Sequence, residues 1–346
     1  MLTAKENMRE VVKFGKPDRY CNSYEALALL QNAFAMHNPR PPRGGDPLPN
    51  AWGVTYTFPE HVPGGFPDHS PDKIVIKDIE HWKDYVKFPS LDFPEAEWDV
   101  FREQYAAVDG TKAFKAAMVA PGLFEQTHHM SEIKNALTYY ITNPDEMHEL
   151  IKGLTEWELK LAELICSKLH PDAMFHHDDW GTEISTFMSP DMFAEFFVEP
   201  YKQIYGYYHQ HGVEFVIHHS DSWAASLVPY MIEMGIDVWQ GVMEKNDVPT
   251  LRQKYAGKIT FMGGINNSSI DLEGWTQKMA DDLVAGVTAD KVTTGFIPCI
   301  TQGGPGSTVP GTYMALVDAI DNRNTELFGW KKEDIEAARI PMNIMF

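Results

Sequence analysis

The stretch from Glu214 to Asp221, Glu-Phe-Val-Ile-His-His-Ser-Asp, changes from apolar residues to residues that can bind a metal or move a proton. Alternate side chains of a β-strand share one face, so His219 and Asp221 are expected to follow Phe215 and Ile217 on the same face. In a parallel α/β barrel that face points inward and ends at the mouth, where active sites lie. The alternative is a half-buried strand whose histidines are satisfied by backbone groups.

Polar residues also follow other apolar segments of the chain. They are Glu125, Gln126, His128 and His129, the run from His176 to Glu183, His218, Gln240, Glu244, the run from Gly263 to Asn267, and Pro298 with Cys299. Structural needs do not require every strand to end in this way. Strand ends that share one mouth can instead build a metal site or an acid–base site.

His219, Asp221 and Cys299 have side chains that can bind a catalytic zinc. His219, Asp221 and Cys299 would supply one nitrogen, one oxygen and one sulfur from two strand ends. Three protein ligands and one open position describe a catalytic zinc site. His218 is the alternative ligand if the strand is rotated.

Asp178 and Asp179 cannot share one face of a regular strand. One can serve as an acid or a ligand while the other orients a neighbour or caps the next turn; alternatively, both are turn and cap residues. Gly263 and Gly264, with Asn266 just beyond them, suit a close approach of the backbone to a ligand at a strand end. A tight turn would explain the glycines equally well.

Strands and helices alternate regularly from residue 113 onward. The expected strands are 113–120, 173–179, 214–221, 237–242, 258–265 and 295–301. The expected helices are 143–169, 189–211, 222–234, 247–256, 270–286 and 310–327. Such alternation indicates parallel βαβ units. With two more strands from the N-terminal third, the chain would close a (β/α)8 TIM barrel; a doubly wound open sheet is the second choice.

The N-terminal part, residues 1–112, is expected to begin with two helices, at 3–14 and 23–36. The segment from Pro39 to Pro94 holds 11 of the 23 prolines, which remove backbone donors and favour irregular structure. We expect a Pro/Gly-rich cover over the core with one hairpin, near 53–58 and 73–77. No linker is evident, so residues 1–346 are taken as one domain in which 113–346 form the regular β/α units.

Charge and cysteine content exclude some classes of partner. The chain has 29 basic and 49 acidic residues, a formal net charge of −20 that repels phosphate backbones, so no nucleic-acid partner is expected. No apolar run has membrane-spanning length, and the start has no signal-peptide core. Cys21, Cys166 and Cys299 are far apart and odd in number, which fits a reducing compartment. We expect a cytoplasmic protein without a membrane partner.

Several short segments occur in the order that one enzyme superfamily shows. They are Thr3-Ala-Lys-Glu-Asn, Gly15-Lys-Pro-Asp-Arg, Ala51-Trp-Gly-Val, Asp178-Asp-Trp-Gly-Thr, Ser189-Pro-Asp-Met-Phe, Gly235-Ile-Asp-Val, Gly263-Gly-Ile and Val309-Pro-Gly. No single segment is specific, but the ordered set spans nearly the whole chain and resembles the uroporphyrinogen decarboxylase superfamily. The resemblance implies a (β/α)8 barrel and either porphyrinogen decarboxylation or cobalamin-linked methyl transfer.

The methyltransferase branch resembles this chain better than the decarboxylases do. The decarboxylases share an N-terminal Arg-x-x-Gly-Arg-Tyr segment that grips tetrapyrrole carboxylates, and the comparable region here keeps only Arg19. Methyltransferases acting on thiols bind zinc through His-x-Cys and a distant Cys. By position, His219 and Cys299 match two of these ligands, whereas Asp221 departs from the pattern. Because thiolate ligands favour soft chemistry, this departure puts transfer to a thiol in doubt.

The resemblance therefore favours the other half-reaction, from a small methyl donor to a corrinoid (cobalamin). The donor would be a methyl ether, preferably aromatic because aromatic residues are plentiful, or a methylamine. Zinc at the His219, Asp221 and Cys299 set would act as a Lewis acid on the leaving oxygen or nitrogen, with Asp179 or Glu183 as proton partner.

The corrinoid is expected to arrive on a separate corrinoid-binding protein, because the chain lacks the Asp-x-His-x-x-Gly loop associated with corrinoid carriage. That protein would dock over the mouth, between the cover and the loop 302–308, with Gly263, Gly264 and Asn266 as candidate cofactor contacts. Three alternatives stay open. They are transfer from a methylcorrinoid to a thiol or folate, a decarboxylase-like lyase in which Asp178 or Asp179 stabilises charge, and a barrel that only binds a partner or ligand.

Overall fold

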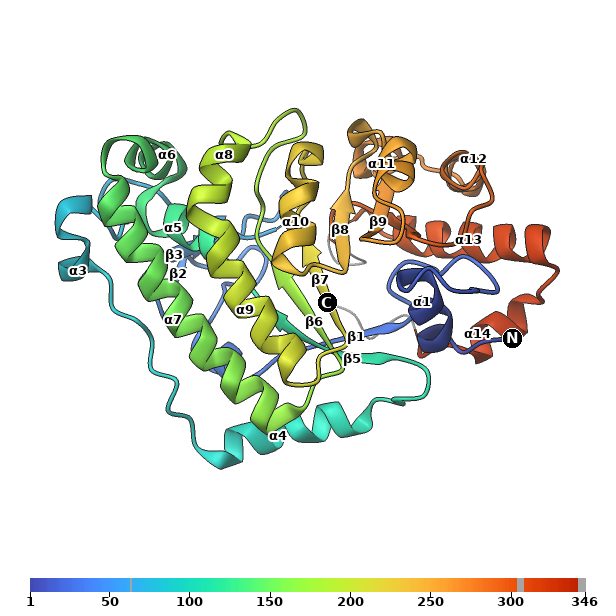
Figure 1. Ribbon diagram of the computed structural model, residues 1–346, viewed down its shortest axis with the longest axis horizontal. Helices are drawn as coiled ribbons and strands as arrows, with labels where there is room; N and C mark the ends of the chain where they lie inside the picture. The colour runs from blue at the N-terminus through green and yellow to red at the C-terminus, as the bar shows by residue number, and fades with distance from the viewer. Residues whose placement is uncertain (63, 304–307, 342–346) are drawn as a thin grey trace.

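The main sheet is parallel and has seven strands in the order β1-β5-β6-β7-β8-β9-β10 (Figure 1). The computed structural model describes residues 1–62, 64–303 and 308–341. The strands are β1 (Leu27–Leu30), β5 (Phe114–Val119), β6 (Ala173–His177), β7 (Phe215–His219), β8 (Val238–Val242), β9 (Thr260–Ile265) and β10 (Phe296–Ile300). The six strands expected after residue 113 are confirmed.

The two edge strands of this sheet come close to each other. The backbone N–H of Ser23, just before β1, donates to the carbonyl of Pro298 in β10 at 3.2 Å. The sheet is therefore curled, as in a barrel. Its described part contains one strand fewer than the eight expected.

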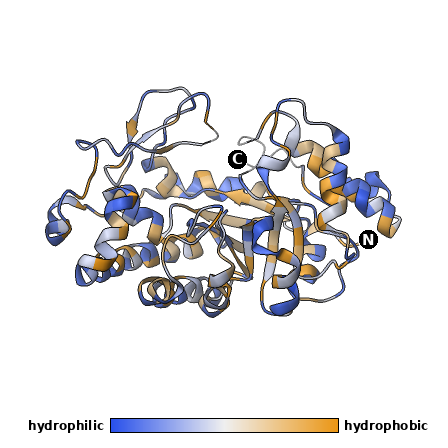
Figure 2. Ribbon diagram, turned by 90° about the horizontal axis from the view of Figure 1, so that it is seen from above, coloured by the Kyte–Doolittle hydropathy of each residue, from blue (hydrophilic) through white to orange (hydrophobic). Residues whose placement is uncertain are grey.

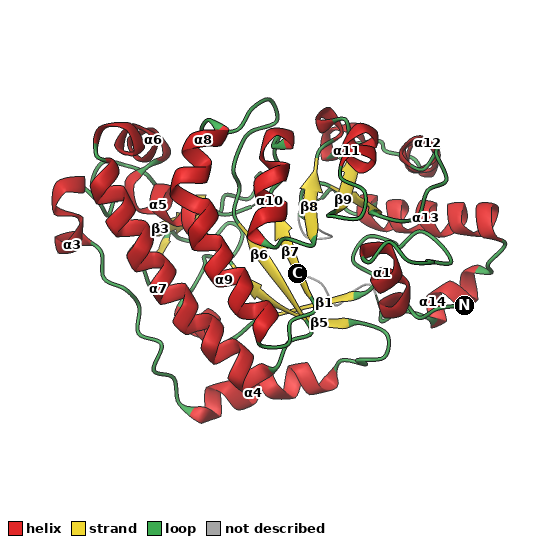
Figure 3. Cartoon of the chain, viewed as in Figure 1, coloured by secondary structure: helices red, strands yellow, loops and turns green. Residues whose placement is uncertain are grey.

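Helices surround the sheet (Figure 3). They are α1 (Ala4–Val12), α2 (Ala33–His37), α3 (Trp82–Tyr85), α4 (Glu95–Ala107), α5 (Leu123–Ser131), α6 (Ile133–Thr142), α7 (Pro144–Leu169), α8 (Pro190–Phe193), α9 (Glu199–Gln210), α10 (Val228–Met234), α11 (Val248–Lys254), α12 (Gln277–Val287), α13 (Thr312–Phe328) and α14 (Lys332–Ala337). Several begin at signals readable in the sequence. Thr3 and Glu6 form a capping box at α1, and Pro144 occupies the first turn of α7.

The helix expected over 189–211 is interrupted. Ser189 caps α8 through a hydrogen bond to the Met192 N–H, and a π-helical turn at Ala194–Val198 separates α8 from α9. Pro200, the second residue of α9, cannot donate a backbone hydrogen bond, which disfavours a regular helical hydrogen-bond ladder here.

The N-terminal part differs from expectation in two places. Residues 23–36 are not one helix, because Leu27–Leu30 pair with β5 as a strand and only α2 is helical. The cover contains a small antiparallel sheet of β2 (Leu48–Pro49), β3 (Thr55–Thr57) and β4 (Phe66–Pro67). The expected hairpin partner at 73–77 is not a strand: Val75 and Ile76 instead donate their N–H groups to the carbonyl of Met130 at the end of α5.

One cluster of buried apolar residues extends from Ala4 to Ile340. Apolar residues are concentrated on the strands in the middle of the molecule (Figure 2). The division at residue 112 stays a prediction. Among the described residues, no helix is both long and apolar enough to cross a membrane.

Candidate active site

The carboxyl ends of β6 and β7 place two histidines side by side. The parallel register pairs His177 with His219, and their rings stack with centroids 4.4 Å apart. Asp179 and Asp221 follow two residues later on the same face. These four residues line a cavity of about 350 Å³, which we call the metal cavity. Its other walls include Tyr24, Phe175, Asn267, Asp271 and Gln302.

An outer partner orients each of the two imidazoles. His177 Nδ1 lies 2.8 Å from Glu125 Oε2, and His219 Nδ1 is hydrogen-bonded to Gln240 Oε1. Because both partners are acceptors, each Nδ1 carries a proton, which leaves Nε2 of each ring as the atom that can bind a metal. A positively charged His177 would release its Nε2 proton when a metal binds. His219 Nε2 lies 3.9 Å from Asp179 Oδ1, so a lone pair and a carboxylate oxygen face each other without a shared proton.

These atoms form a donor set for a cation. One donor atom each from His177, Asp179 and His219 lies within 4.8 Å of the other two. A second group with the same property, Glu125, His128 and His129, adjoins it in the described part of the chain. Two imidazole nitrogens and one carboxylate oxygen, with outer partners on both imidazoles, are a ligand set that zinc accepts.

The charges at this site also favour a cation. Burial and the neighbouring Asp179 raise the pKa of Asp221 to about 8. Burial opposes the positive charge on His177, but Glu125 and Asp179 together outweigh it and raise that pKa to about 10. Burial and the charge on His177 lower the pKa of His219 to about 4, which keeps it in the neutral form that binds metals. No lysine or arginine is among the described residues that line the metal cavity.

Asp178 has a different surrounding from Asp179. Its carboxylate is fully buried and accepts hydrogen bonds from the N–H groups of Phe124 (3.1 Å) and Glu125 (2.7 Å) at the start of α5. It also accepts from Trp180 Nε1 and the Tyr201 hydroxyl. Asp178 therefore holds the beginning of α5, and with it Glu125, the partner of His177. The two aspartates therefore have different neighbours, and Asp178 is the one that holds another element in place.

Two expected site residues lie elsewhere. Cys299 lies within β10, is fully buried, and neither lines the metal cavity nor belongs to either donor group. Burial raises the pKa of its thiol to about 12, although a hydrogen bond with the Ser23 side chain opposes this. Glu183 is exposed and pairs with Lys245 at 3.5 Å. The structure therefore does not bring Cys299 to His219 and Asp221, nor Glu183 to the cavity.

The expected cofactor contacts are packing residues in this structure. A Cβ on Gly263 would lie 2.6 Å from the carbonyl oxygen of Val242, at a bulge between β8 and β9. Asn266 accepts a hydrogen bond from the Glu244 N–H at 3.4 Å. Gly264 faces Phe296. None of Gly263, Gly264 and Asn266 lines the metal cavity, whereas the next residue, Asn267, does.

His177, Glu125 and Gln240 have no predicted role from the sequence, although all three are among the polar residues at strand ends. One signal could have found His177. Two consecutive strands both end in His-His, and parallel pairing in register places equivalent residues of such strands opposite each other.

A second cavity, of about 640 Å³, opens beside the first and shares His177 and Asp179 with it. We call it the cover cavity, because Tyr56, Phe66 and other residues of the small sheet line it. The guanidinium of Arg40 lies 3.5 Å from the centre of the Tyr56 ring. No carboxylate oxygen of a described residue lies within 4.0 Å of that guanidinium.

Metal-capable and acidic groups at the carboxyl ends of a curled parallel sheet are the arrangement of a barrel enzyme. The uroporphyrinogen decarboxylase (URO-D) family model matches residues 48–323, and the chain belongs to this enzyme family. No curated protein sequence matches it.

One solved structure resembles the chain in fold. A methyltransferase from Methanosarcina mazei is 14% identical with a TM-score of 0.66, over 93% of this chain and 99% of its own. Two other structures are more remote. A D-psicose 3-epimerase from Clostridium cellulolyticum H10 has 9% identity and a TM-score of 0.35, over 71% of this chain and 82% of its own. An endo-beta-N-acetylglucosaminidase from Cordyceps militaris has 9% identity and a TM-score of 0.37, over 92% of this chain and 95% of its own.

Proposed function

We propose that the protein is a methyltransferase that moves a methyl group from a small donor to the corrinoid of a partner protein, with zinc bound in the metal cavity. The donor is a methyl ether, preferably aromatic, or a methylamine. The observation that carries the proposal is the convergence of two imidazoles, each held by an outer partner, on the carboxylate of Asp179. Membership of the family and the fold shared with a methyltransferase support it.

The residues that would hold the zinc are His177, Asp179 and His219. His219 was already expected as a ligand from the sequence. His177 and Asp179 replace the expected Asp221 and Cys299, because the donor atoms of His177, Asp179 and His219 lie together. When bound, zinc supplies a Lewis acid that stabilises negative charge on a leaving oxygen or nitrogen.

Two carboxyl groups of the cavity lie outside the proposed ligand set, Asp221 and Asp271. Asp271 accepts a hydrogen bond from the Val309 N–H, whereas burial and Asp179 raise the pKa of Asp221 to about 8, so Asp221 is the proposed proton donor. In the transfer, the bond between the methyl carbon and the heteroatom would break and leave its electron pair on the heteroatom, while the methyl group would pass to the reduced corrinoid of the partner protein, which would supply the electron pair of the new bond. The heteroatom then takes the proton of Asp221, which replaces Asp179 and Glu183 in this role. A reciprocal pair of hydrogen bonds between Asn267 and the backbone of Gln302, at 3.1 and 3.0 Å, fixes the opposite wall.

The corrinoid would reach the methyl group from a separate protein docked over the mouth. The cover formed around β2, β3 and β4 would border that entrance, and the cover cavity beside His177 supports this arrangement. The expected second border, the loop 302–308, lies partly outside the described residues, since 304–307 are not described.

Transfer in the opposite sense, from a methylcorrinoid to a thiol or folate, has less support. A thiol acceptor is best activated by a metal with thiolate ligands. Burial raises the pKa of the Cys299 thiol to about 12, which disfavours the thiolate, and Cys299 does not line the metal cavity.

A decarboxylase-like reaction on a small acid is the second candidate, because Arg40 borders the cover cavity without a carboxylate partner among the described residues. A tetrapyrrole with several carboxylates fits less well. Arg19, the one residue kept from the decarboxylase motif, is fully buried and paired with Asp18 and Glu25.

Two measurements test the proposal: the zinc content of the protein and the absorption spectrum of cob(I)alamin. Zinc per chain is measured for the wild type, His177→Ala, His219→Ala and Cys299→Ala. We expect the two histidine variants to lose zinc and Cys299→Ala to retain it. Methyl transfer is followed as loss of the cob(I)alamin absorption band after addition of methyl ethers or methylamines. A wild type that binds no zinc and leaves the band unchanged with every donor contradicts the proposal, and release of carbon dioxide from a small acid favours the second candidate.

A further inference from the structure

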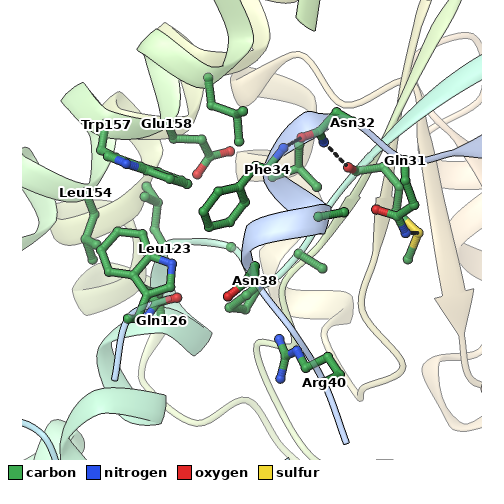
Figure 4. A pocket seen from close by; sticks show the side chains of 18 of the residues that line it. Gln31, Asn32, Phe34, Asn38, Arg40, Leu123, Gln126, Leu154, Trp157 and Glu158 are labelled. Atoms are coloured by element: carbon green, nitrogen blue, oxygen red, sulfur yellow. Dashed lines mark hydrogen bonds between the residues drawn. The ribbon is translucent and has the colours of Figure 1, made fainter. Parts of the chain in front are cut away.

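A third cavity, of about 430 Å³, lies between α2, the end of β5, α5 and α7 (Figure 4). Its volume falls in the range of small-molecule sites. Aromatic rings form much of its wall: Phe34 and Trp157 meet edge to face with centroids 4.9 Å apart, and Trp52 and Trp157 do so at 4.8 Å. We call it the aromatic cavity. Edge-to-face ring clusters of this kind accept a further aromatic ring well.

Glu158 of α7 brings a carboxylate into this apolar wall. The residue is 4% exposed, and Figure 4 shows its carboxylate beside the rings of Phe34 and Trp157. Its Oε1 lies 2.6 Å from His176 Nε2. Its Oε2 has no hydrogen-bond partner in the part of the chain that the structure describes.

The contacts of Glu158 leave Oε2 as the oxygen available to a ligand. Oε1 and His176 Nε2 are 2.6 Å apart, a distance that requires a proton between them. The other nitrogen of His176, Nδ1, lies 3.1 Å from the Tyr205 hydroxyl, which in turn lies 2.8 Å from His218 Nδ1. A carboxylate, or a carboxyl group whose proton lies on Oε1, offers Oε2 as a hydrogen-bond acceptor.

Gln126 of α5 offers a hydrogen-bond donor to the same cavity. Its side chain lines the same cavity, is 4% exposed, and its Nε2 has no hydrogen-bond partner among the described residues. A buried amide N–H group without a partner is unfavourable, and a ligand acceptor would satisfy it. The cavity thus offers an aromatic wall, one acceptor and one donor.

We infer that the aromatic cavity binds a small hydroxylated aromatic molecule, a phenol in chemical class, at a site distinct from the metal cavity. The ring packs against Phe34 and Trp157. The hydroxyl group donates to Glu158, and an oxygen of the ligand is the acceptor that Gln126 Nε2 lacks. The site does not depend on the proposed methyl transfer, because it shares no residue with the metal cavity except Met118.

Phenol itself is the probe, with titration of the full-length protein followed by quenching of tryptophan fluorescence and by calorimetry. Cyclohexanol keeps the hydroxyl group without the aromatic ring, and toluene keeps the ring without the hydroxyl. We expect saturable binding of phenol, with both controls at least tenfold weaker. Phenol that does not saturate, or toluene that binds as tightly as phenol, overturns the inference.

Two variants test the location. Ala35→Phe places a ring inside the aromatic cavity without removing a polar group. Asp179→Asn changes a residue that lines the metal and cover cavities but not the aromatic cavity. Ala35→Phe is expected to abolish phenol binding while zinc content is kept, and Asp179→Asn is expected to do the reverse. Glu158→Gln should weaken phenol at least tenfold, with its fold checked by circular dichroism. Unchanged phenol binding in Ala35→Phe contradicts the site, whereas loss of zinc alone bears only on the proposed function.

Discussion

Asp178 and Asp179 are consecutive residues whose carboxylates serve different parts of the molecule. Asp178 accepts hydrogen bonds from the first N–H groups of α5, and Asp179 faces His219 across the metal cavity. The period of two in an extended chain produces this division. The first carboxylate therefore positions the helix that carries Glu125, while the second belongs to the donor set itself.

Replacing Asp178 by alanine should destabilise the protein far more than replacing Asp179. Asp178→Ala leaves two backbone N–H groups, an indole N–H and a tyrosine hydroxyl without their buried acceptor. We expect a loss of about 3–5 kcal/mol in the free energy of unfolding, measured by urea denaturation. Asp179→Ala should lose zinc but change stability by less than about 1 kcal/mol, because Asp179 is partly exposed. Equal losses in the free energy of unfolding of the two variants would show that Asp178 does not stabilise the fold more than Asp179 does.

Gln240 should control zinc affinity without touching the ion. Its Oε1 accepts the proton of His219 Nδ1 and so directs Nε2 toward Asp179. Gln240→Leu removes that acceptor, and we expect zinc affinity to fall by about 10–100-fold, measured by competition with a chromogenic chelator. Gln253→Leu, at an exposed position on α11, is the matched control and should keep wild-type affinity. A Gln240→Leu protein with unchanged affinity would mean that His219 is not a ligand through Nε2.

The sequence predicted most of the sheet because apolar runs between helices are a strong signal. It failed at β1, where Leu27–Leu30 consists of residues that favour helices. Pairing with β5 and burial in the core decide the strand there, and neither is local information. Tertiary contacts override propensity in such a segment.

The candidate site was predictable only in part, and strand depth explains the difference. Asp179 and Asp221 follow the last residues of β6 and β7, so they stand at the mouth, whereas Cys299 is inside β10 and pairs with Gly264. Alternation within a strand gives the face on which a residue lies, but not its level relative to residues of other strands. That level depends on the register between strands, which the sequence does not display.

Gly263 should tolerate no side chain. Its φ of +150° is rare for other residues, and a Cβ would lie 2.6 Å from the Val242 carbonyl oxygen in the adjacent strand. We expect Gly263→Ala to lower the free energy of unfolding by about 2–4 kcal/mol in urea denaturation. Gly286→Ala is the control, because Gly286 lies in α12 with nothing within 4 Å of a built Cβ. That variant should be stabilised by about 0.5–1 kcal/mol, and a stable Gly263→Ala protein would contradict the bulge geometry.

The ion pair at the start of β7 should give the protein a stability that depends on pH. Arg9 binds both carboxylate oxygens of Glu214 at 2.7 and 2.8 Å, and Lys13 Nζ adds a third contact at 2.7 Å. The hydrogen bonds from Arg9, opposed by burial, lower the pKa of Glu214 from its ordinary value of 4.5 to about 2. Because the pKa is lower in the folded state, the unfolded state binds a proton first as the pH falls. The stabilisation is therefore complete above about pH 5 and is lost between pH 4.5 and 2.

Glu214→Gln isolates this contribution. We expect the variant to be less stable than the wild type by on the order of 1–2 kcal/mol at pH 7, a value discounted for the partly exposed carboxylate. Since the wild-type carboxylate becomes protonated, the difference should shrink at pH 3 and vanish near pH 2, measured by urea denaturation at each pH. Glu183→Gln, whose exposed carboxylate contacts Lys245 at 3.5 Å, should change stability by less than about 0.5 kcal/mol throughout. If the difference in the free energy of unfolding between the wild type and Glu214→Gln grew as the pH fell, its pH dependence would be opposite to the one expected. The ion pair could then not be its cause.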